Sequence, residues 1–384
     1  MSERYPGARI SATPPVPSGP YNISTASGVW SLDQQLQYQQ QGIWPTAGLT
    51  PNYIEDVFST WLYTGNNSGG ATPTQTITNS IDLSGKGGMT LLQCRSNDTG
   101  TAWNVYDTAR GVRNYLRSNS TAAQSTASSG SGLTTFNSNG FTLGTTSNTE
   151  NFNGYTYASW TFRKQPKFFD IVTFTGDGTD GRAISHSLGS VPGCIIMRKT
   201  SAVDDWYVYH RNGNDGTQTG LGLLNSSAAF DLTANTFGGP GAVPVFPTST
   251  TFTIRNSINA TGATYIAYIF AHNAGGFGLT GTDNVISCGS YTGNGGAGNT
   301  ITLGYEPQWL LVKCSTNINQ KWVLLDNMRG LPVNSQNEAV LFANTTAAES
   351  TAFTGSTSVS LTATGFILDG GATELNSKIG RAHV

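Results

Sequence analysis

Charged side chains are scarce in this sequence of 384 residues. Lys and Arg number 20 and Asp and Glu 22, so 11% of the chain is charged, less than half of the roughly 25% found in ordinary soluble proteins. Long amphipathic helices need charged outer faces, so the composition excludes a mainly helical or α/β fold. The formal net charge of −2 also excludes nucleic acid as a partner, because phosphate binding requires a basic surface.

Long apolar runs and closely spaced cysteines are also missing. No stretch of apolar residues approaches the ~18 needed to span a membrane, so we expect no membrane insertion. The N-terminal twenty residues have no apolar core and do not read as a secretory signal. The cysteines are widely spaced and form no CxxC pair, which favours buried free thiols over disulfides or metal ligands. They are Cys94, Cys194, Cys288 and Cys314.

Glycine and aromatic residues are plentiful. The 47 Gly supply turns, and 8 Trp, 15 Tyr and 17 Phe are enough to build cores, which argues against disorder. A chain of this length predicts two or three domains. The composition therefore indicates a multi-domain, turn-rich, all-β protein.

The N-terminal part differs from the rest of the chain. Residues 1–20 are rich in Pro, Gly and Ser and are expected to form a flexible leader. The range 21–79 is interpreted as an N-terminal attachment segment. It contains a short helix over 32–41, for which Ser31 is the N-cap and Gly42 the end. We expect this helix to act as a surface clip, with an oligomer contact as the alternative.

The remainder of the chain is repetitive. SNSTAAQST at 118–126 recurs as ANTTAAEST at 343–351 and, less closely, as LNSSAAFDL at 224–232. A strand led by tryptophan precedes each copy, starting at Trp103, Trp206 and Trp322. NGYTYASWTF likewise matches TGATYIAYIF. The repeat of about 110 residues suits a β-sandwich better than a solenoid, whose repeats are 20–50 residues long.

These repeats predict tandem β-sandwich modules of the jelly-roll or lectin-like kind behind the short N-terminal helix. The expected modules span 80–167, 168–277 and 278–377. The range 50–80 is left open for the first strands of module 1.

The end of the chain departs from the repeat. Modules 1 and 2 close with a strand of the YASWTF type, whereas the third ends in KIGRAHV. These seven residues, 378–384, read as the translation of a sequencing adaptor joined to a metagenomic fragment. We therefore expect them to be an artefact in which Arg381 and His383 carry no function. The third module would then lack its closing strand and expose a sheet edge.

Several segments together resemble modules of tail-fibre, tail-appendage and other structural proteins of tailed bacteriophages from marine bacteria. They are GVWSLDQQLQYQQQGIWP, YASWTFRKQPKFFDIVTFTG, SHSLGSVPGCIIMRK, WNVYDTARG, NSTAAQST, SNGFTLG and GSYTGNGG, and the resemblance covers about residues 25–377. It implies a virion component that is made in the bacterial cytoplasm and partners other virion proteins. It also implies a homotrimer and brings no catalytic site. Host-surface polysaccharide is expected as a ligand because uncharged polar loops offer hydroxyl and amide groups to glycans, and no cofactor is expected.

One polar group recurs within the modules at fixed spacing. The Trp-led strands of modules 1 and 3 end in Asp followed by Arg three residues later, whereas module 2 has His210 and Arg211 instead. The group comprises Trp103, Asp107, Arg110, Trp206, His210, Trp322, Asp326 and Arg329. An Asp beside an Arg after a strand most simply closes a turn by a charge-assisted hydrogen bond. The functional interpretation is a saccharide-binding edge, where Trp stacks on the sugar and Asp accepts from its hydroxyls.

Two other groups of acidic residues have candidate functions. Asp177 and Asp180 in GDGTDG are candidate Ca²⁺ ligands, but a hairpin turn is the favoured interpretation, because an EF-hand loop needs more carboxylates and a distal Glu. A polysaccharide depolymerase would need two carboxylates about 5–10 Å apart, which Asp204 with Asp205, or Asp170 with Asp177, would have to supply. We expect no enzyme activity.

The preferred function is a structural and adhesive virion component that contacts host-surface glycans. The alternatives are a purely structural virion protein, such as a capsid decoration or neck component, and a depolymerase.

Overall fold

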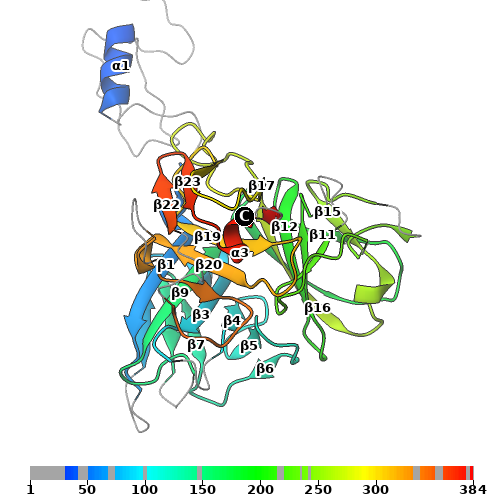
Figure 1. Ribbon diagram of the computed structural model, residues 1–384. Helices are drawn as coiled ribbons and strands as arrows, with labels where there is room; N and C mark the ends of the chain where they lie inside the picture. Colours follow the sequence, from blue (N-terminus) through cyan, green and yellow to red (C-terminus); the bar gives the residue numbers. More distant parts are fainter. Residues whose placement is uncertain are drawn as a thin grey trace, which may run out of the picture. The chain divides into compact units, whose positions relative to one another are not determined.

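The computed structural model describes most of the chain (Figure 1). The described residues are 31–41, 51–67, 74–97, 102–144, 149–213, 220–233, 236–240, 244–331, 338–350, 358–377 and 381–383. The chain divides into two units. The smaller comprises Met1–Tyr53 with Gly275–Asp283, and the larger comprises Ile54–Ala274 with Asn284–Val384.

The described part of the smaller unit contains helix α1 (Leu32–Gln40), which confirms the predicted helix. Ser31 caps it, because its hydroxyl accepts from the Gln34 N–H while the Gln34 side chain accepts from the Ser31 N–H, a reciprocal capping box. Leu32 and Leu36 are exposed. Gly42 and the predicted leader over 1–20 lie outside the described residues.

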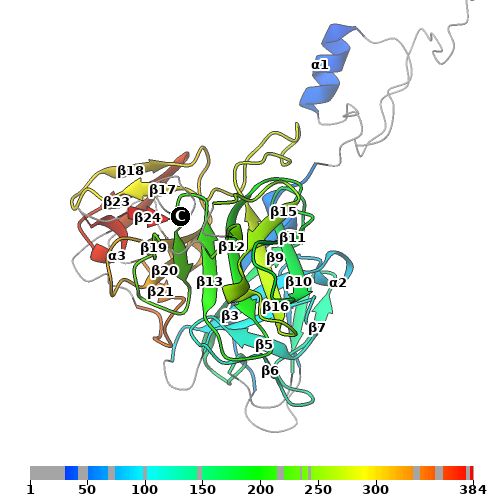
Figure 2. The same ribbon diagram turned by 90° about the vertical axis from the view of Figure 1, so that its right-hand side faces the viewer.

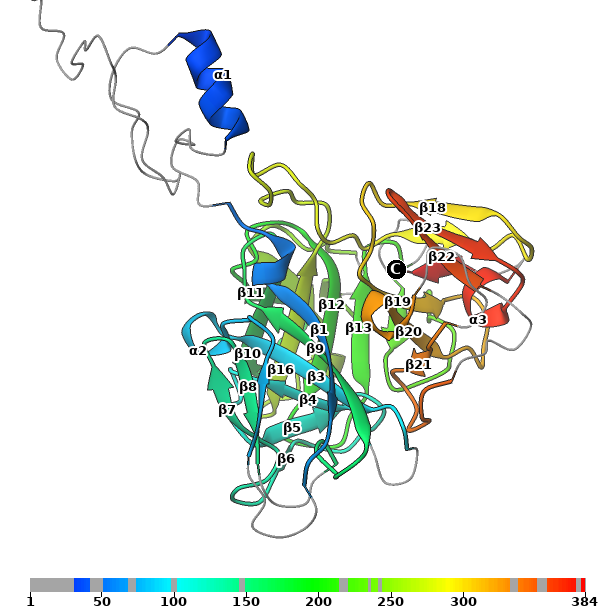
Figure 3. The ribbon, with the colours of Figure 1, turned by 90° about the vertical axis from the view of Figure 1, so that its left-hand side faces the viewer.

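The larger unit consists of three modules, each with one long and one short antiparallel sheet. The all-β class is thereby confirmed. Module 1 has the long sheet β1 (Phe58–Thr64), β9 (Thr156–Arg163), β3 (Gly88–Cys94), β4 (Asn104–Asp107), β5 (Asn114–Arg117), β6 (Ser125–Thr126) and the short sheet β2 (Gln75–Thr78), β8 (Gly140–Leu143), β7 (Leu133–Asn137). Figure 3 shows its long sheet toward the viewer. Its first two strands lie within the range 50–80 that the sequence left open.

Modules 2 and 3 repeat this order. Module 2 has β10 (Phe169–Thr175), β16 (Thr264–Ala271), β12 (Pro192–Lys199), β13 (Trp206–His210), β14 (Leu221–Leu223) and the short pair β11 (Arg182–Ser185), β15 (Thr251–Ile254) (Figure 2). Module 3 has β17 (Ser290–Thr292), β24 (Arg381–His383), β19 (Trp309–Cys314), β20 (Trp322–Asp326), β21 (Leu341–Phe342) and the short sheet β18 (Asn299–Thr302), β23 (Gly365–Asp369), β22 (Ser358–Thr362). Short helical turns join them: η1 (Ile54–Asp56), α2 (Leu83–Lys86), η3 (Asn256–Ile258), η4 (Asn327–Arg329) and α3 (Thr373–Asn376).

Each module has a hydrophobic core that draws side chains from both of its sheets. In module 1, Leu92 and Tyr157 of the long sheet belong to the same buried cluster as Ile77 and Phe141 of the short sheet. The same arrangement recurs in modules 2 and 3. Burial of apolar surface on both inner faces is the main force that stabilises each module.

The third module does have a strand in the place where its closing strand was expected to be missing. β24 pairs with β17 and with β19, as β9 pairs with β1 and β3. It has three residues, however, whereas β9 and β16 have eight.

The three modules close on one another in a cycle. In each, a backbone N–H at the same position of the repeat donates to the same carbonyl of the next module. The three bonds are Gln124 to Thr200 (2.9 Å), Phe230 to Ser315 (2.8 Å) and Glu349 to Arg95 (2.9 Å). Because module 1 contacts module 2, module 2 contacts module 3 and module 3 returns to module 1, the larger unit has approximate threefold symmetry within a single chain.

Candidate functional site

The repeated tryptophans are buried where neighbouring modules meet. Trp103, Trp206 and Trp322 are 0%, 1% and 4% exposed. The indole nitrogen of Trp206 donates to the carbonyl of Arg117 in module 1 (2.8 Å), and that of Trp322 donates to the carbonyl of Leu223 in module 2 (2.9 Å). The nitrogen of Trp103 has no hydrogen-bond partner among the described residues. The Trp206 and Trp322 indoles therefore join neighbouring modules, and all three rings are too buried to stack on a sugar.

The Asp–Arg pairs close the turns after β4 and β20. Asp107 accepts from the backbone N–H of Arg110 (2.8 Å) and from its Nε (2.5 Å). Asp326 accepts from Arg329 in the same two ways, at 2.9 and 2.6 Å. In each pair the guanidinium Nη2 also donates to the carbonyl of the residue two positions before the Asp. That residue is Val105 for Arg110 and Leu324 for Arg329. The turn-closing interpretation therefore describes both pairs.

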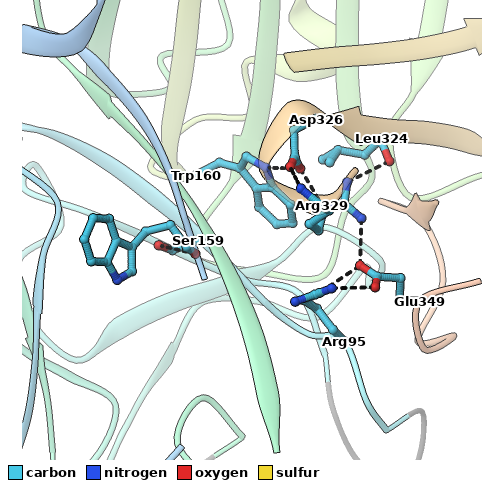
Figure 4. Close-up of polar contacts among 8 residues, drawn as sticks. Arg95, Ser159, Trp160, Leu324, Asp326, Arg329 and Glu349 are labelled. Atoms are coloured by element: carbon cyan, nitrogen blue, oxygen red, sulfur yellow. Dashed lines mark hydrogen bonds and ion pairs between the residues drawn. The ribbon is translucent and has the colours of Figure 1, made fainter. Parts of the chain in front are cut away.

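Each of these aspartates also accepts a hydrogen bond from another module. Oδ2 of Asp107 accepts from the Tyr268 hydroxyl of module 2 (2.7 Å), and Oδ2 of Asp326 accepts from the Trp160 indole of module 1 (2.9 Å; Figure 4). Tyr268 and Trp160 occupy one repeat position, opposite Ile196 in β12 and Leu91 in β3. Both carboxylates are 0% exposed. We name the two clusters the Asp–Arg–aromatic junctions.

The junction at Asp326 extends to a second ion pair (Figure 4). Arg329 Nη1 donates to Glu349 (3.2 Å), and Glu349 binds Arg95 of module 1 through both carboxylate oxygens, at 2.7 and 2.8 Å. The Arg329 guanidinium also lies 5.3 Å from the centroid of the Trp160 ring. Paired arginine–carboxylate contacts of this bidentate kind are directional as well as strong, so they fix module 3 against module 1.

Module 2 carries His210 at the corresponding strand end. The imidazole is 4% exposed, and its Nδ1 accepts from the backbone N–H of Asn212 (3.2 Å). His210 thus takes the turn-closing part that Asp107 and Asp326 have in their own modules.

The saccharide-binding interpretation is therefore not supported for these eight residues, since they lie in the interior of the larger unit. Sequence reasoning missed their partners, above all Trp160, Tyr268 and Glu349. The signal was available, because Trp160 and Tyr268 align in the repeated YASWTF and YIAYIF strands and carry polar atoms in otherwise apolar runs.

The Ca²⁺ candidates lie in the loop between β10 and β11. The predicted hairpin is wrong, because β10 pairs with β16 and β11 pairs with β15 in a different sheet. Asp177 accepts from the Thr179 N–H and the Asn259 amide and pairs with Arg182 (3.3 Å), and these contacts lower its pKa. Asp180 pairs with Arg255 (3.1 Å), which lowers the pKa of that carboxyl. Each carboxylate is engaged with its own arginine, and the described residues contain no group of three or more His, Cys, Asp or Glu placed to hold a metal ion.

The acidic pairs considered for a depolymerase also have structural partners. Asp204 binds Lys199 (2.8 Å) and the Tyr207 hydroxyl (2.6 Å). Asp205 accepts from the Asn225 amide (2.8 Å). Asp170 accepts from the backbone N–H of Ser187 and pairs with Lys164, the latter at 3.0 Å. The four cysteines are free thiols, as expected.

A buried polar position recurs on the strands that face the neighbouring module. Gln93, Arg198 and Lys313 align in β3, β12 and β19, and all are 1% exposed or less. Arg198 donates to the Ala122 carbonyl of module 1 (2.6 Å). Lys313 donates to the Ser227 carbonyl of module 2 (3.3 Å) and to that of Gln320 (2.6 Å).

Lys313 should make stability depend on pH. Burial lowers the pKa of its ammonium from 10.5 to about 8. Between pH 8 and 10.5 the unfolded chain therefore binds more protons than the folded chain, so the free energy of unfolding rises with pH. We expect Lys313→Met to remove this rise, which amounts to at most about 1.4 kcal/mol per pH unit. Urea unfolding of both proteins from pH 7.5 to 10 measures it, and a constant difference between them would contradict the prediction.

The fold and these junctions define a class of all-β protein in which three repeated modules of one chain close in a cycle through buried polar contacts. Residues 54–382 match the model of a family described as a domain of unknown function (DUF7483), and the chain belongs to that family. Neither the curated proteins nor the solved structures include a match to the chain. Within the described residues, no helix is both long and apolar enough to span a membrane.

Proposed function

We propose that this chain is a structural, non-catalytic component of a tailed-phage virion, in a tail fibre or tail appendage. The observation that carries the proposal is the closed cycle of three modules, in which the recurring polar residues serve to hold one module against the next. The recurring polar side chains bond to groups of the same chain. Such a unit suits a structural part of a particle, which must keep its shape.

Two sequence properties support the virion assignment. The repeated segments resemble modules of phage structural proteins. The scarcity of charge leaves a surface of Ser, Thr, Asn and Gly, whose interactions depend less on salt than those of a charged surface. Other virion proteins are the proposed partners, the virion is the proposed location, and a homotrimer is the proposed assembly, which sedimentation of the purified chain would measure.

Mass spectrometry of purified particles from a phage that encodes this chain tests the proposal. We expect its peptides at a stoichiometry comparable to that of other tail proteins, and flanking tail genes in the genome. Detection only in the lysate, with none in particles purified by density gradient, would overturn it.

Contact with host-surface glycans is the second candidate, and one exposed aromatic residue favours it. Trp61 on the edge strand β1 is 39% exposed, unlike the three buried tryptophans of the repeats. Binding of the protein to host polysaccharide that Trp61→Ala abolishes, with Trp206→Phe as the buried control, would support adhesion through this edge. No binding by the parent protein would leave the purely structural role.

A further inference from the structure

The three equivalent contacts between modules differ in charge. At each contact one backbone N–H crosses to one carbonyl, and the donor and acceptor residues are Gln124 with Thr200, Phe230 with Ser315, and Glu349 with Arg95. Of these three pairs, that between module 3 and module 1 joins an acidic to a basic residue. We name this contact the seam. Its two side chains also bind each other through both carboxylate oxygens, at 2.7 and 2.8 Å.

The ion pair of the seam is partly open to solvent. The Arg95 side chain is 21% exposed and that of Glu349 is 14% exposed, whereas Arg329 and Asp326 of module 3 form a pair in which both side chains are 0% exposed. Dissolved ions screen charges that water can reach, and the screening length falls from about 8 Å at 0.15 M salt to about 3 Å at 1 M. Added salt should therefore weaken the attraction between Arg95 and Glu349.

The seam also lacks two buried hydrogen bonds that the other contacts have. The repeated tryptophans of modules 2 and 3 donate to a carbonyl of the neighbouring module, but the indole nitrogen of Trp103 has no hydrogen-bond partner among the described residues. The side-chain amide of Gln93 has none there either, although Arg198 and Lys313 at the same position donate to the neighbouring module. Solvent ions cannot approach buried bonds of this kind, so the seam has fewer contacts that are insensitive to salt.

Modules 3 and 1 are also the pair of modules that no direct chain connection joins. The chain passes from module 1 to module 2 and from module 2 to module 3, so modules 3 and 1 are held together by noncovalent contacts. Lys164 of module 1 pairs with Asp170 of module 2 (3.0 Å), but these two residues lie within the chain connection itself. Screening of that pair leaves modules 1 and 2 joined.

We propose that the seam opens locally when salt screens its ion pair, while the contact between modules 1 and 2 stays closed. Opening separates Glu349 from Arg95. It also breaks two further hydrogen bonds that cross the seam, from the Ser118 hydroxyl to the Ala343 carbonyl (2.7 Å) and from the Trp160 indole to Asp326 (2.9 Å). Because these bonds remain to hold the seam, the open form is a minor and reversible state whose population rises with salt.

Hydrogen exchange of the full chain, measured by NMR at constant pH, tests the proposal. The amides of Glu349 and Gln124 are equivalent probes of the seam and of the contact between modules 1 and 2. We expect exchange of the Glu349 amide to become about fivefold faster from low salt to about 1 M NaCl, the upper end for a partly exposed ion pair, because local opening exposes the amide. The Gln124 amide should change by less than about twofold. An equal change at both amides, or a change below about twofold at Glu349, would overturn the proposal.

Two variants show whether the ion pair is the salt-sensitive element. Glu349→Gln keeps the backbone amide and should make its exchange fast at low salt and independent of added salt. Glu306→Gln, which removes the charge of an exposed glutamate, should leave the parent behaviour unchanged. Gln93→Arg places in the seam the donor that Arg198 supplies in module 2, and should slow exchange of the Glu349 amide at least about threefold. Retention of the parent salt dependence by Glu349→Gln would contradict the proposal.

Discussion

Asp326→Ala should lower the free energy of unfolding by about 3–5 kcal/mol, the cost of removing one partner from a buried ion pair. The side chain of Arg329 is 0% exposed, and Asp326 supplies two of its contacts, through the backbone N–H and Nε. The substitution also removes the acceptor for the Trp160 indole of module 1. The buried Arg329 guanidinium would keep only Glu349 and the Leu324 carbonyl as acceptors, and the buried Trp160 N–H would lose its acceptor in the same step.

Urea unfolding followed by tryptophan fluorescence measures this loss. Met328→Ala is the matched control, because Met328 lies in the same turn and is 53% exposed, so its replacement should change stability by no more than about 0.5 kcal/mol. The double variant Asp326→Leu with Arg329→Met should recover part of the loss, since it leaves no uncompensated charge. A loss below about 1 kcal/mol for Asp326→Ala would show that the junction contributes little to module contact.

The modules themselves could be predicted because their signals are local. A Trp-led apolar run, a glycine-rich turn and a repeated NTTAAEST-like segment each lie within about ten residues, and their recurrence aligned β4, β13 and β20 without any structure. The capping residue Ser31 likewise placed α1. The alternation of inward and outward side chains then limits the register of paired strands, but it does not give their order in the sheet.

The closure of the modules could not be predicted, because its contacts join residues that are far apart in sequence. Trp160 bonds Asp326, and Tyr268 bonds Asp107, and no local pattern connects them. The same limit explains the failure of the saccharide-binding interpretation. A tryptophan at the head of an apolar strand has the same sequence signature whether its outer face meets water, a sugar or another module.

The aromatic cluster around Phe162 is the point at which all three modules contribute to one packed group. Phe162 is 3% exposed and packs against rings from each of them. Its ring neighbours are Phe58 of module 1 at 4.9 Å, Phe168, Phe169 and Phe270 of module 2 at 6.3, 5.7 and 5.5 Å, and Trp309 of module 3 at 5.5 Å. Truncation here removes contacts within module 1 and between modules at the same time.

Phe162→Ala should therefore cost about 3–5 kcal/mol, the range for buried phenylalanine, and should weaken the coupling between modules. If the modules unfold as one unit, fluorescence and far-ultraviolet circular dichroism will give coincident urea transitions in the parent chain and separated ones in the variant. Phe246→Ala, at a phenylalanine that is 47% exposed, should leave both the midpoint and the coincidence unchanged. A loss in Phe162→Ala with transitions that stay coincident would mean that the buried polar junctions suffice to couple the modules. A separation of the transitions would assign that coupling to the shared aromatic cluster, since the junctions at Asp107 and Asp326 are intact in this variant.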